Sequence, residues 1–582
     1  MQERATATVT GTERPPTEWQ CVDWRKANQV VSNLRQRIFR ATQQGDWAKV
    51  RSLQKLMLRS YSNTLVSVRK VTQENTGKRT PGVDKVVVKT PSLRGRLVDL
   101  LMTNQPWKAR PARRIYIAKA NGKQRGLGIP TIVDRCLQAR VKNALEPSWE
   151  ARFEGSSYGF RPGRGCHDAI ERIYLLACPH KTKKWVVDAD IKGAFDHISH
   201  TYLLDTIGSV PGRELIRQWL KAGYVDKDVF FDTEEGTPQG GVISPLLANI
   251  ALHGMEEALG VKYDSSGNLR SKRAVVKYAD DFVVFCESKE DAEKVTGELT
   301  HWLAQRGLTL SPEKTKIVHL TEGFDFLSYN VRHYKRTRTR TGWKLLIQPS
   351  KDAVKKVRRK LKEKWLSLKA TPVAVTCTQL NPIIRGWANY HRVKVATRTF
   401  QAMDRWMFYR AARWAKFRHH GKSTAWRSHR YWGRLNPERQ DTWVFGDKRT
   451  GVYLLKFAWF TRRHHILVKG KASPDDPALR DYWHQRRTAK AYDLNAKDRR
   501  LATRQGYVCA ICHDSLMNGE ALQIQHILPR EDPRRNDESY QRLAHLLCQQ
   551  QLTTVQRQRS RAGCQPVPAC EETDRTGLSV GA

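Results

Sequence analysis

The stretch VVKYADDFVVF (residues 275–285) sets two adjacent carboxylates, Asp280 and Asp281, between two apolar runs. The Val and Phe content of each run is typical of a buried strand, so we expect a strand, a turn at the Asp pair and a returning strand. Neighbouring carboxylates in apolar surroundings are driven towards their neutral forms unless a cation compensates them. Lys277 is one candidate partner, but strand alternation turns it away from at least one Asp. A divalent metal that takes hard oxygen ligands, such as Mg²⁺, is the better partner.

A site for two metal ions needs a further carboxylate, and the stretch WVVDADIKGAFDHI (residues 185–198) supplies one. Asp190 ends its strand-like run, and Gly-Ala-Phe follows as a turn into a helix. The acids of this stretch, Asp188, Asp190 and Asp196, could also be ordinary surface residues, and a YxDD tetrapeptide can occur by accident. The two motifs together, in one strongly basic chain, favour a metal site.

The charge of the chain indicates a polyanionic partner. Its 582 residues include 103 Lys and Arg against 57 Asp and Glu, which gives a formal net charge of +46. An excess that is spread along the whole chain is typical of a nucleic-acid-binding protein. A ribosome-associated or membrane-surface protein is the alternative, but the 18 Trp residues and the 40% hydrophobic content argue against a simple polycationic coat.

The cellular setting follows from segments that the sequence lacks. No run of residues approaches the length of a membrane span, and the N-terminal stretch MQERATATVTGTERPPTEW has no apolar signal core. Most of the 11 Cys residues stand singly, as in a reducing compartment. We therefore expect a soluble cytoplasmic protein that has no membrane partner.

Apolar spacing divides the chain into segments of different kinds. Spacings of three and four predict helices over about 20–75 and 350–435, both rich in Lys and Arg. Between residues 115 and 326, short β-type runs alternate with helical patterns, which indicates an α/β or α+β sheet domain. Residues 505–557 gather Cys and His, and the polar residues from about 558 are expected to be disordered.

Tyr278-Ala-Asp-Asp281 is the YxDD signature of reverse transcriptases, and further motifs stand in the order found in the group II intron-encoded proteins of bacteria. These motifs are RRIYIAKANGKQRGLGIPTIVDRCLQ (113–138), SSYGFRPGRGCHDAI (156–170), WVVDADIKGAFDHI (185–198), EGTPQGGVISPLLANI (235–250), LTLSPEKTKIVHL (308–320), FDFLSYNVRH (324–333) and LNPIIRGWANYHR (380–392). The chain resembles that family from about residue 20 to residue 557.

This resemblance implies an α+β fold: a right-hand polymerase with fingers and palm, an α-helical thumb, a basic DNA-binding region and a small zinc-stapled HNH-like domain. The implied domains are a basic helical extension of the fingers (1–85), the reverse transcriptase fingers and palm (86–345), the thumb or maturase X domain (346–440), the DNA-binding region (441–498), the degenerate HNH-like domain (499–560) and a disordered tail (561–582).

The implied function is that of an RNA-directed DNA polymerase and maturase. It would bind its intron RNA as a ribonucleoprotein, assist splicing and copy the RNA into cDNA during retrohoming into target DNA, in the bacterial cytoplasm or at the nucleoid. Asp190, Asp280 and Asp281 would hold two Mg²⁺ ions for phosphoryl transfer from dNTPs. One alternative is a splicing-only maturase, which the intact carboxylates disfavour. The others are a retron-like reverse transcriptase and an RNA polymerase, which GWANYHR (386–392) disfavours.

The resemblance also implies roles in nucleotide binding. Lys119 and Arg125 fall where the family holds the triphosphate, and Gln239 falls where it contacts the sugar. Phe195 stands where the family stacks a ring under the incoming sugar and rejects a 2′-hydroxyl, although a core Phe is an equal alternative. Lys314 could protonate the leaving pyrophosphate, and Lys316 competes with it for that role.

Two positions depart from the family pattern near this site. Gly126 follows Arg125 where the family usually has Pro, and we expect it to loosen that loop. The usual Phe-Leu-Gly of the primer grip reads Phe326-Leu327-Ser328, and Ser can replace Gly there only if no positive φ is required.

Basic and aromatic residues alternate in the region that resembles the maturase domain. Arg385, Trp387, Tyr390 and Arg392 suit contacts with an RNA backbone and with unpaired bases, although many aromatic residues of this region could be core. The basic, loop-rich residues 455–490 resemble the region that contacts the DNA target.

Two pairs of residues near the C-terminus have equal spacing: Cys509 with Cys512, and His545 with Cys548. A Cys₃His site for a structural Zn²⁺ would stabilise a segment too small for a large core, and the alternative is unpaired Cys with a hydrogen-bonded His. QIQHILPR (523–530) resembles the HNH nuclease block of the family.

The nuclease block keeps only part of its chemistry. His526 would be the general base, but Gln525 and Gln549 stand where the family has charged or imidazole metal ligands. A neutral amide is a weak metal ligand, so we predict a zinc-stapled fold whose nuclease centre is damaged.

Overall fold

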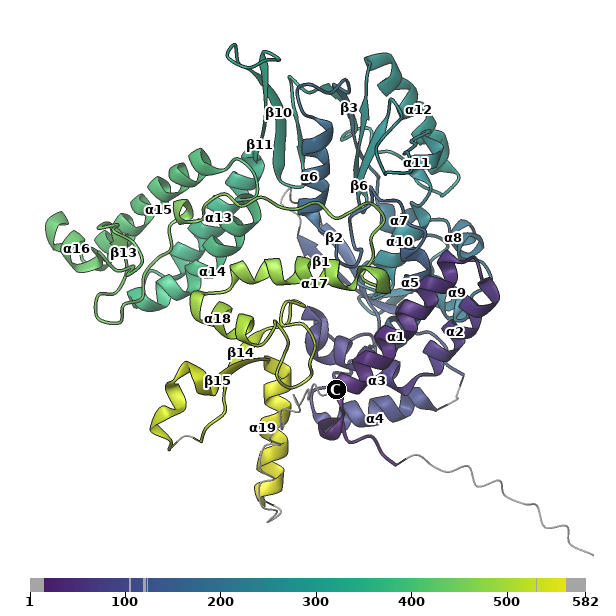
Figure 1. Cartoon of the computed structure of the whole chain (residues 1–582), viewed down its shortest axis with the longest axis horizontal. Coiled ribbons are helices and arrows are strands. Elements are labelled where there is room, and N and C mark those ends of the chain that lie inside the picture. Colours follow the sequence, from purple (N-terminus) through teal and green to yellow (C-terminus); the bar gives the residue numbers. More distant parts are fainter. Residues whose placement is uncertain (1–14, 104–105, 119–121, 123, 530, 562–582) are drawn as a thin grey trace, which may run out of the picture. The chain divides into compact units, whose positions relative to one another are not determined.

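The computed structural model describes residues 15–103, 106–118, 122, 124–529 and 531–561 (Figure 1). It forms two compact units, each discontinuous in sequence. We call them the central unit (Phe153–Tyr202 and Ala248–Ala472) and the terminal unit (Met1–Arg152, Leu203–Leu247 and Ser473–Ala582). Their borders differ from the linear domain ranges predicted above, which stay a prediction. No described helix is long and apolar enough to cross a membrane.

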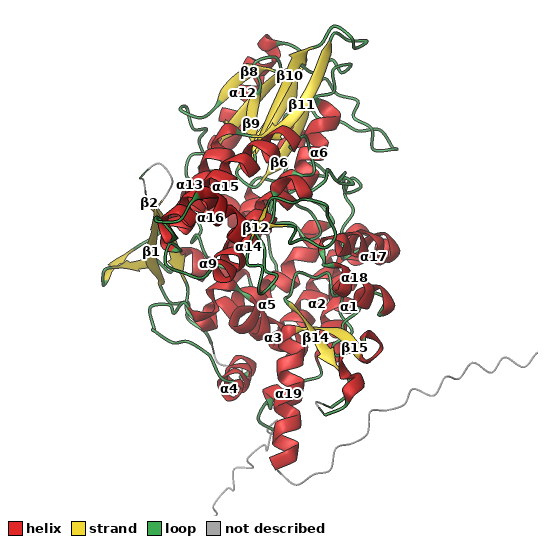
Figure 2. Ribbon diagram, turned by 90° about the vertical axis from the view of Figure 1, so that its left-hand side faces the viewer, coloured by secondary structure: helices red, strands yellow, loops and turns green. Residues whose placement is uncertain are grey.

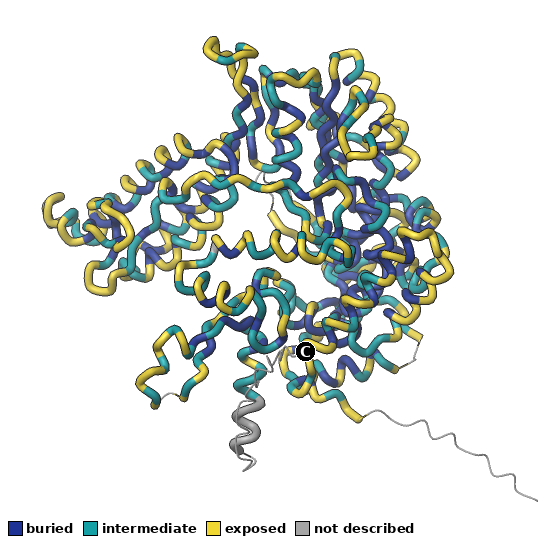
Figure 3. Tube along the Cα trace, in the orientation of Figure 1, coloured by how far each residue is buried: buried dark blue, intermediate teal, exposed yellow. Residues whose placement is uncertain are grey.

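The central unit contains a four-stranded antiparallel sheet in the order β6-β7-β3-β8. Its strands are β3 (Trp185–Asp190), β6 (Ala274–Tyr278), β7 (Asp281–Cys286) and β8 (Lys316–His319). The continuous Val and Phe runs of β6 and β7 are buried and dark blue in Figure 3, because helices cover the sheet. Helix α6 (Cys166–Leu176) packs on β6, and α12 (Lys289–Ala304) packs on β3 and β7 (Figure 2). The sequence predicted the strands β3, β6 and β7, and it predicted that strands and helices alternate in this region.

The second sheet of the central unit leads into a helical bundle. Its order is β11-β10-β9, from β9 (Phe324–Phe326), β10 (Tyr329–Lys335) and β11 (Trp343–Pro349). The helices are α13 (Lys351–Ser367), α14 (Val373–His391), α15 (Thr397–Arg418) and α16 (Thr424–Tyr431), followed by strands β12 (Trp432–Gly433) and β13 (Val444–Phe445). Val357, Leu361 and Trp365 recur every four residues on α13, so one face of this basic helix joins the core of the bundle.

Further short helices occur in both units. They are α7 (Ala194–His197) and α11 (Met255–Ala258) in the central unit, α9 (Arg213–Lys221) in the terminal unit, and α8 (His200–Ile207) and α10 (Ser244–Ala251), which run across sequence borders of the two units.

The terminal unit begins with the basic helices that the sequence predicted. These are α1 (Trp24–Gln43), α2 (Trp47–Arg59) and α3 (Tyr61–Arg69), and the side chains of Asp23, Asp46 and Ser60 cap their first turns. A π-helical turn (Lys70–Glu74) extends α3, and α4 (Pro91–Met102) and α5 (Ile132–Glu150) follow. A four-stranded sheet in the order β2-β1-β4-β5 comprises β1 (Ala112–Ala118), β2 (Gln124–Ile129), β4 (Tyr224–Asp226) and β5 (Val229–Phe231).

The C-terminal Cys and His segment shares its hydrophobic core with these N-terminal helices. It comprises α17 (Arg480–Thr488), α18 (Ala496–Arg504), β14 (Leu522–His526), β15 (Gln541–His545) and α19 (Leu546–Arg561). Trp24 and Val68 belong to the same buried cluster as Cys509, Leu516 and Leu543. Among the described residues, the buried side chains of this segment therefore share a core with the N-terminal helices, and the small domain at 499–560 stays a prediction.

Candidate active site and metal centre

Two strands bring the three predicted catalytic carboxylates to one end of the central sheet. β3 ends at Asp190, and its antiparallel register with β7 places Asp190 opposite Asp281. β6 and β7 form a hairpin in which Tyr278 pairs with Asp281, so that Ala279 and Asp280 make the turn. Ala279 has a φ of +58°, a conformation that costs a non-glycine residue roughly 1–2 kcal/mol. The tight turn that presents the Asp pair is therefore strained at Ala279.

The carboxylates are half-buried, and the charges of neighbouring acids act on Asp281. Burial, with the charges of Asp280 and Asp190, raises the pKa of Asp281 to about 7. Burial also raises the pKa of Asp188 to about 6, with contributions from Asp325 and Asp190. A cluster of carboxylates in this state is stabilised by added positive charge. Closely spaced oxygen donors of this kind fit a hard divalent cation such as Mg²⁺.

Lys314 is the lysine that reaches the carboxylates. Its Nζ donates a hydrogen bond to Oδ2 of Asp190 at 2.6 Å, and this bond raises the pKa of Lys314. The backbone holds it there, since the Ser311 N–H donates to the Asp190 carbonyl at 2.8 Å. Lys316, the competing candidate, lies on β8 opposite Asp188.

A buried ion pair anchors β6, the first strand of the hairpin. No sequence pattern indicated this pair. Lys277 on β6 is fully buried, and its Nζ lies 3.1 Å from Oε2 of Glu154 and also donates to the Leu252 carbonyl. Lys277 therefore compensates Glu154 and not the Asp pair, as strand alternation suggested.

The residues before α6 add a strand-like segment to the edge of β6. The Lys277 N–H donates to the Ser156 carbonyl at 3.0 Å, and the Tyr158 N–H donates to the Lys277 carbonyl at 2.9 Å. At Gly159 a Cβ atom would collide with the backbone nitrogen of Ala279, so only glycine fits against the turn. Gly159 is thus a functional position that the sequence analysis did not single out; its glycine in SSYGFRPG was the available signal.

Phe195 lies on the first turn of α7, soon after Asp190 in the sequence. Its side chain is 7% exposed and packs edge to face on Phe160, with ring centroids 6.2 Å apart. Phe160 has a φ of +59° and is 49% exposed. A mostly buried ring is compatible with both interpretations of Phe195, the sugar gate and the core residue.

In the terminal unit, two of the predicted nucleotide-binding residues meet. The Arg125 Nε donates to Oε1 of Gln239 at 2.6 Å, and the Gly128 N–H donates to the Gln239 carbonyl at 2.7 Å. A Cβ atom at Gly240, whose φ is +119°, would lie 2.7 Å from the Gly128 carbonyl oxygen, so the Pro-Gln-Gly turn packs tightly on β2. Lys119 lies outside the described residues.

The expectation that Gly126 loosens a loop is wrong. Gly126 is inside β2, where it pairs with Tyr116 of β1. A Cβ atom there would collide with the guanidinium of Arg114, so the glycine makes room for that side chain across the strand.

The primer-grip turn does require positive φ. Leu327 and Ser328 connect β9 to β10 with φ values of +46° and +69°. Tyr390 of α14 holds this turn, because its hydroxyl donates to the Leu327 carbonyl at 2.7 Å and its own carbonyl accepts from the Tyr329 hydroxyl. Ser328 therefore occupies a conformation that favours glycine.

The four predicted RNA-binding residues of α14 and its end have different surroundings. Arg385 is exposed. Trp387 packs against His391, Phe400 and Phe457 of the bundle core. Tyr390 holds the primer-grip turn. Arg392 is half-buried and donates to Oδ1 of Asn389 at 3.1 Å.

The Cys and His pairs converge on one buried centre. One ligand atom from each of Cys509, Cys512, His545 and Cys548 lies within 4.8 Å of all the others. The His545 Nε2 is 3.2 Å from the Ser515 carbonyl, which orients the Nδ1 lone pair towards the thiol of Cys512, 3.3 Å away. Three sulfur atoms and one imidazole, all buried, make a donor set of the kind that tetrahedral Zn²⁺ takes.

The surroundings of the HNH-like residues differ from a metal-dependent nuclease site. His526 ends β14, and its Nδ1 lies 3.0 Å from the Arg535 carbonyl. On the paired strand β15, Arg542 stands opposite Gln525, and its Nε donates to Oε1 of Gln525 at 3.0 Å. The positively charged guanidinium of Arg542 therefore lies beside Gln525. The family resemblance implies a metal ligand at the position of Gln525.

Comparisons with protein families match most of the chain. The N-terminal domain of reverse transcriptase matches residues 19–101, Reverse transcriptase (RNA-dependent DNA polymerase) matches residues 117–331, and the Group II intron, maturase-specific domain matches residues 354–432. The second of these matches contains all three carboxylates of the central sheet.

Individual relatives agree with these matches. Protein YkfC of Escherichia coli K12 is 33% identical over 342 residues, which cover 52% of this chain and 88% of YkfC. Group II intron-encoded protein LtrA of Lactococcus lactis is 34% identical over 283 residues, 38% of this chain and 47% of LtrA, so the match spans about half of LtrA. A telomerase structure from Candida albicans covers 67% of this chain and 63% of its own at 12% identity, but its TM-score of 0.31 is too low to carry an argument.

Proposed function

Because the chain belongs to the group II intron-encoded reverse transcriptases and maturases, we propose that it copies RNA into DNA at Asp190, Asp280 and Asp281 and that it binds the RNA of its own intron. The observation that carries the catalytic part is the pairing of Asp190 with Asp281 beside the Asp280 turn. The elevated pKa of Asp281 supports a cation at this cluster, because a metal ion would offset the mutual repulsion of the acids.

The three carboxylates would hold two Mg²⁺ ions. Such ions supply activation of the primer 3′-hydroxyl and charge stabilisation on the phosphates of the nucleotide. The chain itself contributes a protonated amine, because Lys314 holds its proton against Asp190. We assign Lys314 the role of delivering a proton to the leaving pyrophosphate, which Lys316 cannot fill from its place opposite Asp188.

Selection of the nucleotide would rest on three further residues. Arg125 supplies a cation for the triphosphate, and its hydrogen bond to Gln239 orients both side chains before a dNTP arrives. Phe195 would lie under the sugar and exclude a 2′-hydroxyl. Lys119 takes a phosphate-binding role by family resemblance alone.

Maturase function requires a broad RNA surface, and the net charge of +46 provides the long-range attraction for one. We infer that the contacts in the bundle fall on exposed residues and not on those that build its core. Arg385 is the best candidate among the predicted four. Tyr409, Phe417 and Trp443 are more than half exposed and suit stacking on unpaired bases. Residues 441–498 would contact the target DNA, which places this step at the bacterial nucleoid.

We assign the Cys₃His centre a structural Zn²⁺ and no role in cleavage. Arg69 supports this assignment, because its Nη2 lies 3.6 Å from Sγ of Cys548 and donates a hydrogen bond to that sulfur. The HNH-like residues would cleave DNA poorly, because Arg542 opposes a metal at Gln525. Synthesis of cDNA would then begin from a primer that the protein did not cut, such as a nascent strand at a replication fork.

Primer extension on an RNA template tests the catalytic part. The purified protein with Mg²⁺ and dNTPs should extend an annealed DNA primer, and Asp190→Asn should abolish extension. Asp205→Asn is the matched control, since its side chain is 72% exposed and it stands outside the cluster. If the folded wild-type protein fails to extend the primer yet promotes intron splicing, the chain is a splicing-only maturase.

A further inference from the structure

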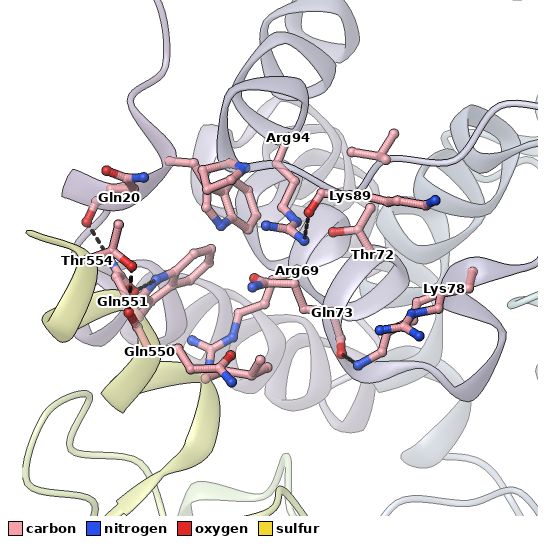
Figure 4. Close-up of a pocket in the computed structure, with 16 residues that line it drawn as sticks. Gln20, Arg69, Thr72, Gln73, Lys78, Lys89, Arg94, Gln550, Gln551 and Thr554 are labelled. Atoms are coloured by element: carbon pink, nitrogen blue, oxygen red, sulfur yellow. Dashed lines mark hydrogen bonds between the residues drawn. The ribbon is translucent and has the colours of Figure 1, made fainter. Parts of the chain in front are cut away.

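A cavity of about 560 Å³ lies in the terminal unit, apart from the residues assigned to catalysis. Three stretches of the chain form its wall: Trp19 to Trp24, the residues from Arg69 to Arg94, and α19 near the C-terminus. Figure 4 shows Lys78 and Lys89 on one side of it and Gln20, Gln551 and Thr554 on the other. Pockets for small ligands have volumes of about 300–1,000 Å³, so this one suits a single nucleotide-sized group.

The wall of this cavity carries cations and no carboxylate. Its five basic residues are Arg69, Lys78, Arg79, Lys89 and Arg94. Arg69 is neutralised, since its Nη2 lies 3.1 Å from Oε2 of Glu520 and its Nε lies 3.4 Å from Oε1 of Glu74. Within the part of the chain that the structure describes, no ion pair reaches the other four.

The chain itself satisfies only part of the Arg94 guanidinium. Its Nη2 donates to the Lys89 carbonyl at 2.7 Å, but its Nε is buried and makes no hydrogen bond. Lys78 likewise donates only to a backbone carbonyl, that of Gln73, at 2.6 Å. A buried guanidinium N–H without a partner, as at Arg94, is costly, and a bound anion such as phosphate would stabilise this cation.

The opposite wall offers recognition of a different kind. Trp19 and Trp24 form its apolar floor, with ring centroids 5.0 Å apart. The side-chain amide of Gln551 is engaged within the protein, because its oxygen accepts from the Trp24 indole at 2.6 Å and its nitrogen donates to the Gln20 and Val22 carbonyls. Gln550, one residue earlier on α19, is exposed and lines the cavity, so its amide can reach a base edge.

From this arrangement we propose that the cavity binds one unpaired nucleotide of an RNA strand, with phosphate at Lys89 and Arg94 and the base towards Gln550. Single-stranded RNA is recognised in this way, by cations on the backbone and by polar and aromatic side chains on a base that is turned out of its stack. The choice of RNA over a free nucleotide rests on the proposed function. The cavity itself does not depend on it.

The cavity also links the two ends of the chain. Leu547 and Gln550 flank Cys548 on α19, and Arg69 contacts both the cavity and the Cys548 sulfur. The Cys₃His centre therefore holds one wall of the nucleotide site in place.

Site-specific crosslinking tests the proposal, since a chain of this charge binds RNA at many places. The full-length protein is irradiated with a short single-stranded RNA that carries 4-thiouridine, and crosslinked peptides are mapped by mass spectrometry. We expect crosslinks in residues 15–24 or 546–554. The double variant Lys89→Gln, Arg94→Gln should lose them and should bind the RNA about tenfold more weakly, because two charge-assisted contacts are removed.

The matched control is Arg270→Gln, Lys289→Gln, which removes the same charge from side chains that are 72% and 56% exposed in the central unit. Equal effects of the two double variants on crosslinking and affinity would overturn the proposal. So would crosslinks that a DNA strand of the same sequence forms equally well, or a site that takes free nucleoside phosphates but not RNA. Wild-type primer extension, measured on the same preparation, reports separately on the polymerase.

Discussion

Ser328 occupies a turn position that suits glycine better. With φ of +69° it follows Leu327, itself at +46°, in the two-residue connection between β9 and β10. A residue with a Cβ atom is strained by roughly 1–2 kcal/mol in this conformation. Glycine avoids that strain, but it loses more conformational entropy on folding, so the net gain in stability is smaller. We therefore predict that Ser328→Gly stabilises the protein by about 1 kcal/mol, seen as a higher thermal midpoint. The same change at Ser52, an exposed residue inside α2, should lower the midpoint. A drop in stability for Ser328→Gly would show that the hydroxyl has a role the turn geometry does not reveal.

Phe195 poses a different question, because a buried ring fits both a sugar gate and a core residue. If it is the gate, Phe195→Ala should raise the use of ribonucleotides relative to deoxynucleotides by about tenfold or more, which is the size of effect that one changed pocket contact gives. The measurement is the ratio of kcat/KM for rNTP and dNTP, in which the fraction of folded enzyme cancels. A reduced rate with an unchanged ratio would make Phe195 a core residue only.

The sequence predicted some of these residues and not others for a physical reason. Asp190, Asp280 and Asp281 could be found because a charged group between apolar runs conflicts with its surroundings and needs an explanation. Gly159 and Glu154 could not, since their importance lies in a close approach and an ion pair with β6, more than a hundred positions along the chain. Gly126 was misjudged because a single glycine does not reveal which side chain lies across it.

The hairpin of β6 and β7 depends on the segment that runs beside it. Ser156 and Tyr158 hydrogen-bond with Lys277, and Gly159 lies against the turn that carries Asp280. A methyl group at Gly159 must push this backbone or the turn away, and both are held by neighbouring hydrogen bonds. Displacement of a reacting group by about 1 Å can cost a hundredfold in rate.

We predict that Gly159→Ala lowers primer extension by about a hundredfold while the protein stays folded. Gly165→Ala is the control from the same loop, because a Cβ atom there meets no atom within 4 Å. Circular dichroism and RNA affinity should be unchanged in both variants. Near-normal extension by Gly159→Ala would mean that the Asp turn tolerates displacement.

Elements with a strong period were the easiest to predict. The strands at 185–190 and 281–286 and the basic helix α13 stand where their apolar patterns placed them. The sequence did not predict that Tyr390 belongs to the packing between α14 and the primer-grip turn, because an aromatic residue next to Arg has the same signature in a core and on an RNA surface.

At the scale of the whole molecule, the two ends of the chain build one core. Trp24 and Gln551 are joined by a hydrogen bond of 2.6 Å across 527 positions of sequence, and Arg69 pairs with Glu520. Periodicity describes neighbours along the chain and cannot predict such pairings. For this reason the Cys and His spacing predicted that these four side chains converge but not that they share a core with the N-terminal helices.

The arrangement of the C-terminal residues predicts zinc binding without DNA cleavage. The buried Cys₃His centre can hold Zn²⁺ without catalysing a reaction, whereas cleavage needs a hydrolytic metal beside a general base. Since Arg542 stands at Gln525, we predict one bound zinc per chain and little or no nicking of target DNA by the ribonucleoprotein with Mg²⁺. Zinc content by mass spectrometry and a strand-nicking assay check the two parts. Robust nicking that disappears in His526→Ala would contradict the assignment.

The central claim is that cDNA synthesis resides in the carboxylate cluster, whereas RNA binding and splicing rest on basic and aromatic surfaces elsewhere. The most direct test measures both activities in one preparation of the variant Asp280→Asn, Asp281→Asn. The account predicts no detectable cDNA, with intron affinity and splicing rate within about twofold of the wild type, since neither Asn changes the basic surface. A folded double variant that loses splicing together with cDNA synthesis, or that still makes cDNA, would contradict it.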